Sequence, residues 1–254
     1  MFKLLSKAVK EALGREDVLK DLRRKGARLI VGTFLIVITI VVNANYGIEV
    51  TRNIALVMML IVVAADYARI GFGVNMPFLE PFMMHTYEKE GFQGTTFAAI
   101  GTLLTLSFTD FDIAIAAISM FMYGDAAANI IDRTFGKSKV LGWDKTIVGG
   151  VAMLVICIII GRIFISDPHT SLFMALFATL IEVAIVAPAD DFAVPLFTAL
   201  GGQFFGALLG LRSYLEGSLS GILLFVVSLA ITLGFVGLFN SIRRLLDWQK
   251  KSYT

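Results

Sequence analysis

Cysteine and histidine are scarce in this chain of 254 residues, which contains one cysteine and two histidines. Cys157 lies alone inside an apolar run, so the chain has no second thiol for a disulfide or a cysteine-based metal site. His85 and His169 stand singly in polar stretches, where a histidine is more often a surface or structural residue than a catalytic one. The chemistry of an active site is therefore expected from carboxylates and lysines.

The chain also lacks a large net charge and any sign of a modular organisation. A net charge of +2 gives no reason to expect nucleic acid as a partner. No internal repeat, low-complexity tract or long linker is present, and residues 1–28 are too charged for a secretory signal. We therefore expect a basic amphipathic segment at 1–28, a single transmembrane domain at 29–240 and a short tail at 241–254.

Apolar residues, in contrast, make up 57% of the chain, and the mean hydropathy is +0.81. A soluble domain of this size cannot bury that much apolar surface, and a helix needs roughly 20 apolar residues to cross a bilayer. The sequence therefore predicts an all-α, polytopic integral membrane helical bundle with about eight, or alternatively seven, spans. The predicted segments lie near 29–45, 53–68, 95–109, 112–131, 147–165, 171–187, 192–211 and 219–240.

The lysines and arginines indicate how this bundle is oriented. With residues 1–28 in the cytosol and eight spans, nineteen of the 22 cationic side chains face the cytosol. The opposite orientation inverts this bias, so both termini are predicted to be cytosolic. We expect the protein in the cell membrane, or in the endoplasmic reticulum membrane of a eukaryote.

Several polar residues lie near the predicted cytosolic ends of these segments. They are Asp66 and Arg69 after the second segment, Asp125 and Asn129 in the fourth, Glu182 in the sixth, and Asp190 and Asp191 in the short turn before the seventh. A charged side chain at the membrane centre costs roughly 2.5–3.5 kcal/mol. Such residues are therefore usually functional or close to an interface, and here they gather on one side.

The stretch between the fourth and fifth segments is basic and contains glycine. Carboxylates bind Mg²⁺ through oxygen, and Mg²⁺ commonly binds substrate phosphates as well. Lysines and glycine-bearing backbone at the start of a helix bind phosphate oxygens. Here "DKTIVGG" places Lys145, Thr146, Gly149 and Gly150 where the fifth segment begins. The combination favours a site for a nucleotide with its metal. The alternative is that the loop is basic because cytosolic loops usually are, and that the aspartates are there because acidic residues are common at helix ends.

At these residues the sequence resembles the CTP-dependent lipid kinases, the family of dolichol kinase, phytol kinase and CTP-dependent diacylglycerol kinase. The family pattern D-x-x-A-x-x-x-G-x-x-x-G-K followed by K-T-x-E-G is matched at Asp125, Ala128, Gly136, Lys137, Lys145, Thr146 and Gly149. A glutamate followed by an acidic turn and proline is matched at Glu182, Asp190, Asp191 and Pro195. A further element is matched at Asp66, Arg69, Glu88, Glu90 and Gly94. Together with the basic start "RRKGAR", the resemblance covers roughly residues 20 to 215.

Three positions depart from the family pattern. Asp132 stands where the family has a glycine, and Val148 stands in place of the glutamate of K-T-x-E-G. Arg28 replaces the histidine that usually follows the opening basic pair. The loss of the glutamate could shift metal binding or nucleotide choice. Asp132 lies two turns from Asp125 on the same face if the helix continues, so it is a candidate for the missing carboxylate.

The resemblance implies transfer of the terminal phosphate of CTP, or of another nucleoside triphosphate, to a lipid alcohol. The expected catalytic residues are Asp125, Lys145, Asp190 and Asp191. The expected Mg²⁺ ligands are Asp125, Asp190, Asp191 and Glu182. The nucleotide is expected on Asn129, Gly136, Lys137, Lys145, Thr146, Gly149 and Gly150. Supporting roles are expected for Asp66, Arg69, Glu88 and Asp132.

Two other functions remain open from the sequence. A cytidylyltransferase that makes a CDP-lipid shares the topology and the K-T-x-E-G element, but its closing histidine- and glycine-rich element is absent here. A transporter or a non-catalytic relative is the other alternative. Transporters usually place polar groups near the membrane midplane, whereas the polar groups here are predicted at one face.

Overall fold

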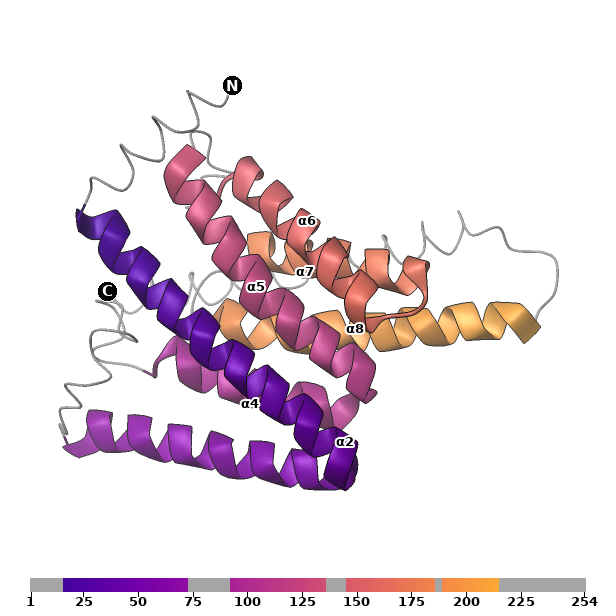
Figure 1. The fold of residues 1–254 in the computed structure, drawn as a ribbon, viewed down its shortest axis with the longest axis horizontal. Coiled ribbons are helices and arrows are strands. Elements are labelled where there is room, and N and C mark those ends of the chain that lie inside the picture. The colour runs from indigo at the N-terminus through magenta and orange to yellow at the C-terminus, as the bar shows by residue number, and fades with distance from the viewer. Residues whose placement is uncertain (1–15, 73–91, 136–144, 186–188, 215–254) are drawn as a thin grey trace, which may run out of the picture.

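The computed structural model describes residues 16–72, 92–135, 145–185 and 189–214 (Figure 1). Within these ranges the regular structure consists of helices without a strand. The all-α prediction is therefore confirmed for the described part of the chain. The predicted segment 219–240, the start of the basic segment at 1–15 and the tail at 241–254 lie outside it.

The first described helix, α2 (Glu16–Phe72), consists of two helical arms that join at Gly47. Gly47 has φ 81° and ψ 174°, backbone angles that a residue with a Cβ rarely adopts. The predicted segments 29–45 and 53–68 lie in the first and second arm. Figure 1 shows the arms diverging from the bend, so that both ends of α2 lie on the same side of the molecule.

The remaining helices coincide closely with the predicted segments. They are α4 (Gly94–Phe108), α5 (Phe111–Phe135), α6 (Ile147–Phe164), α7 (Pro168–Ala184) and α8 (Ala189–Tyr214). Helix α5 continues past residue 131, so Asp132 is helical as the sequence suggested. Asp190 and Asp191 were predicted in a turn before the helix, but they lie in the first turn of α8. Acidic side chains stabilise a helix N-terminus, which explains why the helix begins before them.

Four stretches in the described ranges are long and apolar enough to cross a membrane. They are Gly26–Phe72, Phe111–Asp132, Ile147–Phe164 and Asp190–Gly210. The first contains both arms of α2, while α4 and α7 are shorter apolar helices of 15 and 17 residues. A helical bundle with several apolar helices is thus established, and the count of eight spans stays a prediction.

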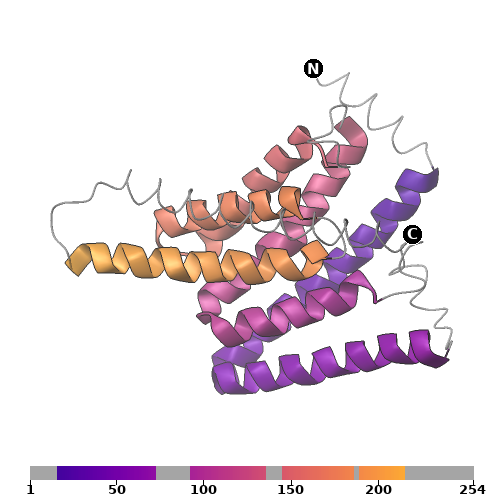
Figure 2. The same cartoon turned by 180° about the vertical axis from the view of Figure 1, so that it is seen from behind.

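The core lies between α5, α6, α7 and α8, which pack against one another (Figure 2). Met120, Met153 and Met174 are fully buried there together with Cys157. The unbranched thioether side chain of methionine adapts to irregular gaps between helices, and the neighbouring alanines let the helices approach closely. On the other side, α4 meets α8 where Gly101 lies against the backbone of Phe192.

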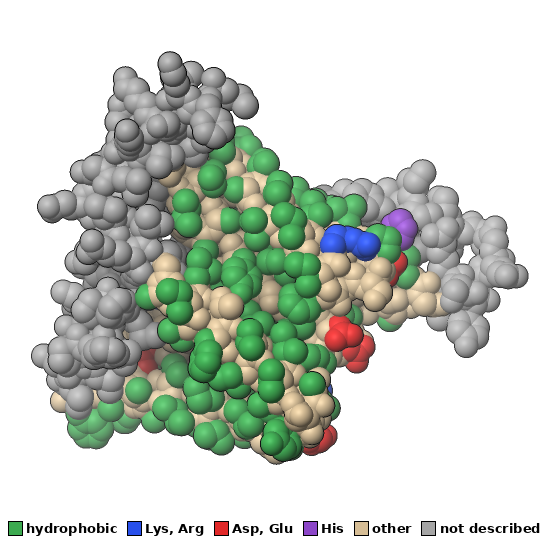
Figure 3. Space-filling model, viewed as in Figure 1, with side chains coloured by type: hydrophobic (Ala, Val, Ile, Leu, Met, Phe, Trp, Pro, Cys, Tyr) green, Lys and Arg blue, Asp and Glu red, His purple; other side chains and the backbone are tan. Residues whose placement is uncertain are grey.

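The outer surface of the bundle is apolar over most of its area. Figure 3 shows hydrophobic side chains covering the visible face, with a few charged side chains toward its right-hand edge. On α6 the exposed apolar residues form a stripe at helical spacing, namely Val148, Val151, Val155, Ile159 and Ile163. Continuous exposed apolar surface of this kind is typical of helices that face lipid or another protein.

Candidate functional site

Those polar residues singled out from the sequence that the structure describes lie on one side of the bundle. This side holds the end of α2, the start of α4, the end of α5, the start of α6, the end of α7 and the start of α8, at the left in Figure 1. The bend at Gly47 and the α4–α5 and α6–α7 connections lie on the opposite side. The alternating direction of the helices therefore collects residues that are far apart in sequence.

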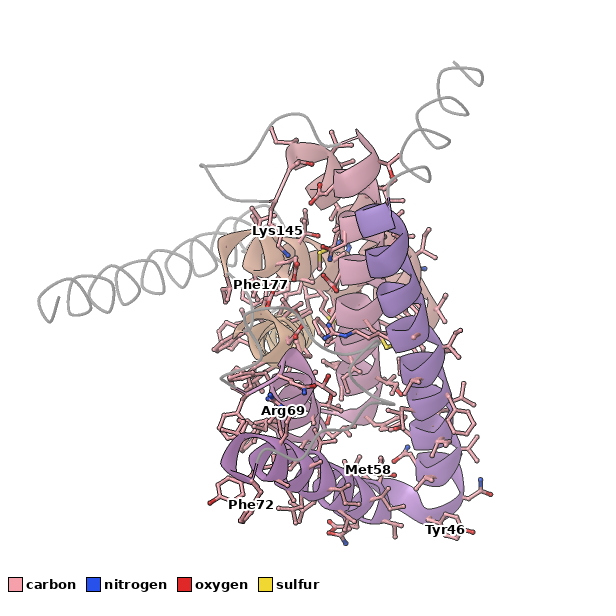
Figure 4. All side chains as sticks on the ribbon, turned by 90° about the vertical axis from the view of Figure 1, so that its left-hand side faces the viewer. Tyr46, Met58, Arg69, Phe72, Lys145 and Phe177 are labelled. Carbon is pink, nitrogen blue, oxygen red and sulfur yellow. The ribbon has the colours of Figure 1, made fainter. Side chains whose placement is uncertain are left out.

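Lys145 is at the centre of the main cluster on this side (Figure 4). Its ammonium forms an ion pair and a hydrogen bond with Glu182 Oε1, and Asp190 Oδ2 lies 3.7 Å from Nζ. Glu182 is 2% exposed and Asp190 is 8% exposed, whereas Lys145 keeps 22% of its side-chain surface. The two carboxylates are thus buried, whereas the Lys145 side chain reaches the surface of the protein.

Asp125 completes the cluster from α5. Burial alone would lower the pKa of Lys145, but the negative charges of Glu182, Asp125 and Asp190 outweigh it and raise that pKa above its usual value. Lys145 therefore keeps its positive charge at every physiological pH. Asn129 donates hydrogen bonds to the Asp125 carbonyl oxygen at 2.8 Å and to Asp125 Oδ1, and so fixes the carboxylate orientation.

Carboxylates outnumber ammonium groups around Lys145. Glu182 and Asp190 both pair with its ammonium, and the negative charge of Asp125 acts on the same group. Glu182 Oε2 is buried and has no hydrogen-bond partner among the described residues. A buried acceptor without a partner usually costs about 1–3 kcal/mol, so this oxygen is a candidate position for a donor or a cation from outside these residues.

A second group fixes the backbone directly after Lys145. Thr146 is the N-cap of α6, and its Oγ1 accepts a hydrogen bond from the backbone N–H of Gly149 at 3.2 Å. The same hydroxyl donates to the Asp132 carboxylate, which also accepts from the Thr146 backbone N–H at 3.4 Å. Gly149 is in contact with that carboxylate, because a Cβ at this position would overlap it. Asp132 thus places a negative charge at the positive end of α6.

Asp190 and Asp191 lie in the first turn of α8, and they differ in their contacts and in burial. The backbone N–H of Asp191 donates to Asp190 Oδ1 at 3.0 Å, which orients the Asp190 carboxylate beside Lys145. Asp191 is less buried than Asp190. Gly150 was predicted in the nucleotide site. A Cβ added to it would lie 3.7 Å from Val183 Cγ2, so Gly150 lies at the contact of α6 with α7.

Asp66 and Arg69 form a separate group at the end of α2, and Figure 4 shows Arg69 apart from Lys145. Asp66 Oδ1 accepts from Arg69 Nε and Nη2 at 2.8 and 2.6 Å. Asp66 Oδ2 accepts from Thr96 Oγ1 and from the Gln93 backbone N–H, both at 2.8 Å. These contacts tie α2 to the start of α4, so the observed role of Asp66 is structural.

Sequence reasoning missed two features of these groups. It did not identify Thr96 and Gln93 as partners of Asp66, although a threonine near a helix start is a usual sign of such contacts. It also did not pair Lys145 with Glu182, which is 37 residues away and gives no local pattern. Of the other predicted site residues, Glu88, Gly136 and Lys137 lie outside the described residues.

The fit of Mg²⁺ can be judged from the donor set and from its arrangement. The carboxylate oxygens of Asp125, Glu182 and Asp190 are the ligand type that Mg²⁺ prefers. Among the described residues, however, no three histidine, cysteine, aspartate or glutamate side chains are placed to hold a metal ion. The donor chemistry therefore suits Mg²⁺, while the Lys145 ammonium pairs with the oxygens of Glu182 and Asp190.

Comparison of the chain with protein-family models, with characterised proteins and with solved structures gave no match.

Proposed function

We propose that the protein is a membrane-embedded kinase that transfers the terminal phosphate of CTP, or of another nucleoside triphosphate, to a lipid alcohol. The observation that carries this proposal is the position of Lys145 among Glu182, Asp190 and Asp125 at one side of an apolar helical bundle. In the proposed arrangement, a water-soluble phosphate donor and an acceptor with an apolar tail would meet at this place. The resemblance to CTP-dependent lipid kinases supplies the nucleotide and the class of acceptor, a polyprenol, a phytol-like alcohol or a diacylglycerol.

Lys145 is assigned to the transferred phosphate. Phosphoryl transfer depends mainly on positioning and on neutralising the negative charge of the phosphate oxygens. Lys145 keeps its charge, is partly exposed and directly precedes a backbone that Asp132 and Thr146 hold in place. Gly136 and Lys137, matched to the same family pattern, would contribute further phosphate contacts.

Asp190 or Asp191 is assigned to the acceptor alcohol. The hydroxyl oxygen attacks the terminal phosphorus, the bond from phosphorus to the bridging oxygen breaks, and CDP leaves with that oxygen. The alcohol proton passes to the carboxylate. Glu182 is less suited to this step because it is almost fully buried and paired with Lys145. Mg²⁺, when bound through Asp125, Glu182, Asp190 or Asp191, would supply further neutralisation of phosphate charge.

The proposed membrane arrangement follows from the cation distribution. Eight spans, or seven, cross the membrane, both termini are cytosolic, and the Lys145 cluster faces the cytosol. The lipid alcohol then approaches from the inner leaflet, and its tail stays in lipid. A cysteine introduced at position 139 of a Cys157→Ser variant is expected to react with an impermeant thiol reagent only from the cytosolic side. Labelling at this position from outside intact cells would contradict the arrangement.

The kinase proposal is tested with the purified full chain in lipid vesicles. CTP, Mg²⁺ and a panel of polyprenols, phytol and diacylglycerol are supplied, and the products are identified by mass. A phosphorylated lipid with release of CDP is expected. Release of pyrophosphate with formation of a CDP-lipid would instead identify a cytidylyltransferase, and the absence of nucleotide binding would contradict both enzymes.

A further inference from the structure

The Asp132 side chain occupies the start of α6. The last turn of α5 brings its carboxylate to Thr146, whose hydroxyl and backbone N–H both donate to it. Gly149 leaves the space that this carboxylate needs, because a Cβ at position 149 would overlap it. A negative charge of the chain itself therefore stands where the positive end of α6 would otherwise attract an anion from outside.

Thr146 uses its hydrogen-bond donors within the chain. Its hydroxyl carries one proton, which goes to Asp132, and the same oxygen accepts from the Gly149 N–H at 3.2 Å. The Thr146 backbone N–H donates to Asp132 at 3.4 Å. A phosphate at this helix start would also lie beside the Asp132 carboxylate, and two negative charges at contact distance repel each other. Thr146 and Gly149, which the sequence predicted in the nucleotide site, are therefore committed to Asp132.

Lys145 stands immediately before this fixed backbone. Its ammonium reaches Glu182 Oε1, has Asp190 Oδ2 at 3.7 Å and keeps part of its side chain at the surface. Four rotatable bonds separate the ammonium of a lysine from its backbone, so the ammonium has a defined place only if the backbone has one. Thr146 is buried, and its bonds to Asp132 hold the backbone next to the lysine.

Helix α5 acts on Lys145 at two places. Asp125 and Asp132 lie seven residues apart, about two helical turns, and therefore on the same face of α5. The negative charge of Asp125 acts on the Lys145 ammonium, while Asp132 binds the residue that follows the lysine. The same helix thus sets the surroundings of the ammonium and, through Thr146, the position of the backbone.

We propose that Asp132 is a positioning residue for Lys145. It binds Thr146, keeps phosphate away from the start of α6 and leaves the Lys145 ammonium as the group at this helix start that meets the phosphate. Asp132 itself contacts neither the nucleotide nor the alcohol. The fixing of the lysine rests on the contacts described above, and its use for a phosphate rests on the proposed function.

The first test measures binding of inorganic tripolyphosphate, at constant Mg²⁺, to the full chain in detergent by equilibrium dialysis. Asp132→Ala is expected to weaken binding about tenfold, the effect of losing one hydrogen bond to a charged group. The alternative predicts the opposite sign. If phosphate bound at the start of α6, loss of the carboxylate would remove a repulsion and tighten binding. Tighter or unchanged binding by Asp132→Ala would overturn the proposal.

The dependence on Lys145 is tested by combining variants. Lys145→Met keeps an unbranched side chain, removes the charge and should itself weaken binding. In this background Asp132→Ala should cause no further loss, because Asp132 acts through the lysine. An equal loss with and without Lys145 would show a general effect on the fold and contradict the positioning role. Asp132→Asn, whose amide oxygen can accept from Thr146, should bind better than Asp132→Ala, and equal losses would contradict the role of these hydrogen bonds.

Asp167→Ala is the matched control. Asp167 caps α7 by accepting from the Thr170 N–H at 2.6 Å, at the opposite side of the bundle. Its removal also takes a carboxylate from a helix start, but it should leave tripolyphosphate binding unchanged, and a loss as large as that of Asp132→Ala would contradict the inference. If Asp132→Ala does not fold, Thr146→Val takes its place, because valine keeps the side-chain shape and removes the hydroxyl. Weaker binding is again expected, and unchanged or tighter binding would overturn the proposal.

A second readout needs neither phosphate nor turnover. The rate at which acetic anhydride acetylates Lys145, followed by mass at that residue, reports how often its amine leaves Glu182. Asp132→Ala should raise this rate about tenfold, for the same loss of a hydrogen bond. A raised rate without phosphorylation of any lipid alcohol would overturn the kinase and leave the fixing of Lys145 standing. An active kinase in which wild type and Asp132→Ala react at equal rates would overturn the positioning role alone.

Discussion

Gly149 provides the sharpest test of the contacts around the start of α6. A Cβ at this position would overlap the carboxylate of Asp132, which is bonded to the hydroxyl and the backbone N–H of Thr146. In Gly149→Ala the carboxylate must turn away, and its two bonds to Thr146 are then lost. At the neighbouring Gly150 a Cβ would have its nearest contact at 3.7 Å, with Val183 Cγ2, which is ordinary van der Waals packing.

The expected cost of Gly149→Ala follows from these contacts. A hydrogen bond to a charged group contributes about 1.5–3 kcal/mol, and overpacking of a tight contact costs about 1–3 kcal/mol. Alanine also lowers the conformational entropy of the unfolded chain relative to glycine, which stabilises the folded state by about 0.4–1 kcal/mol. A net loss of about 1.5–5.5 kcal/mol is therefore expected. For a chain of this size each kcal/mol corresponds to roughly 2–4 °C in the unfolding midpoint.

The assay uses the only cysteine of the chain, which is buried in the core. A thiol-reactive fluorescent dye reports its exposure as the protein is heated in detergent. Gly149→Ala should lower the midpoint, and Gly150→Ala should leave it unchanged or slightly higher. Asp132→Ala should remove the penalty, so that Asp132→Ala with Gly149→Ala is about as stable as Asp132→Ala alone. An unchanged midpoint for Gly149→Ala, or additive losses in the double variant, would refute the contact.

Three further outcomes are expected. Asp125→Asn, which keeps size but removes the charge that the cluster uses, should abolish phosphate transfer while the unfolding midpoint stays close to wild type; near-normal turnover would contradict its role. Lys145→Ala should lower turnover by orders of magnitude, and Lys139→Ala by a few-fold at most. A phosphate contact that strengthens in the transition state is commonly worth about 3 kcal/mol or more, whereas an exposed charge contributes under about 1 kcal/mol. Equal small effects of the two variants would rule out the phosphate contact. Gly101→Ala should lower the midpoint, because its Cβ would lie 2.9 Å from the Phe192 carbonyl oxygen, and an unchanged midpoint would show that α4 and α8 can separate at little cost.

The helices were predictable because an apolar run long enough to cross a membrane must satisfy its own backbone hydrogen bonds. An unpaired peptide group in an apolar environment is costly, so each run forms a helix. The helix ends at polar residues or at a glycine with positive φ. Gly47 marks such an end, and its positive φ places the bend between the first two predicted segments. Asp125 and Asn129 lie four residues apart, so they meet on one helix face, and there the Asn129 amide donates to Asp125.

The contacts of the site were less predictable, because they join side chains that are distant in sequence. Gly149 was assigned to a nucleotide from its place in a motif, and the structure shows it against Asp132. Asp66 was assigned to the site as a support, and it holds the start of α4. In both cases the sequence identified a residue with an unusual requirement, but only the packing of the helices shows which partner meets that requirement.

A comparison of the two buried charged groups separates structural from functional chemistry. Asp66 uses both carboxylate oxygens, and its charge is balanced by Arg69, so this group needs nothing from outside the chain. In the Lys145 cluster, Glu182 and Asp190 both pair with one ammonium, and Glu182 Oε2 has no hydrogen-bond partner in the described part of the chain. Apolar residues in place of a buried charged group often give equal or greater stability. Stability alone therefore gives no reason to keep a lysine with two buried carboxylates at this place, whereas a phosphate bound by Lys145, as proposed above, would give one.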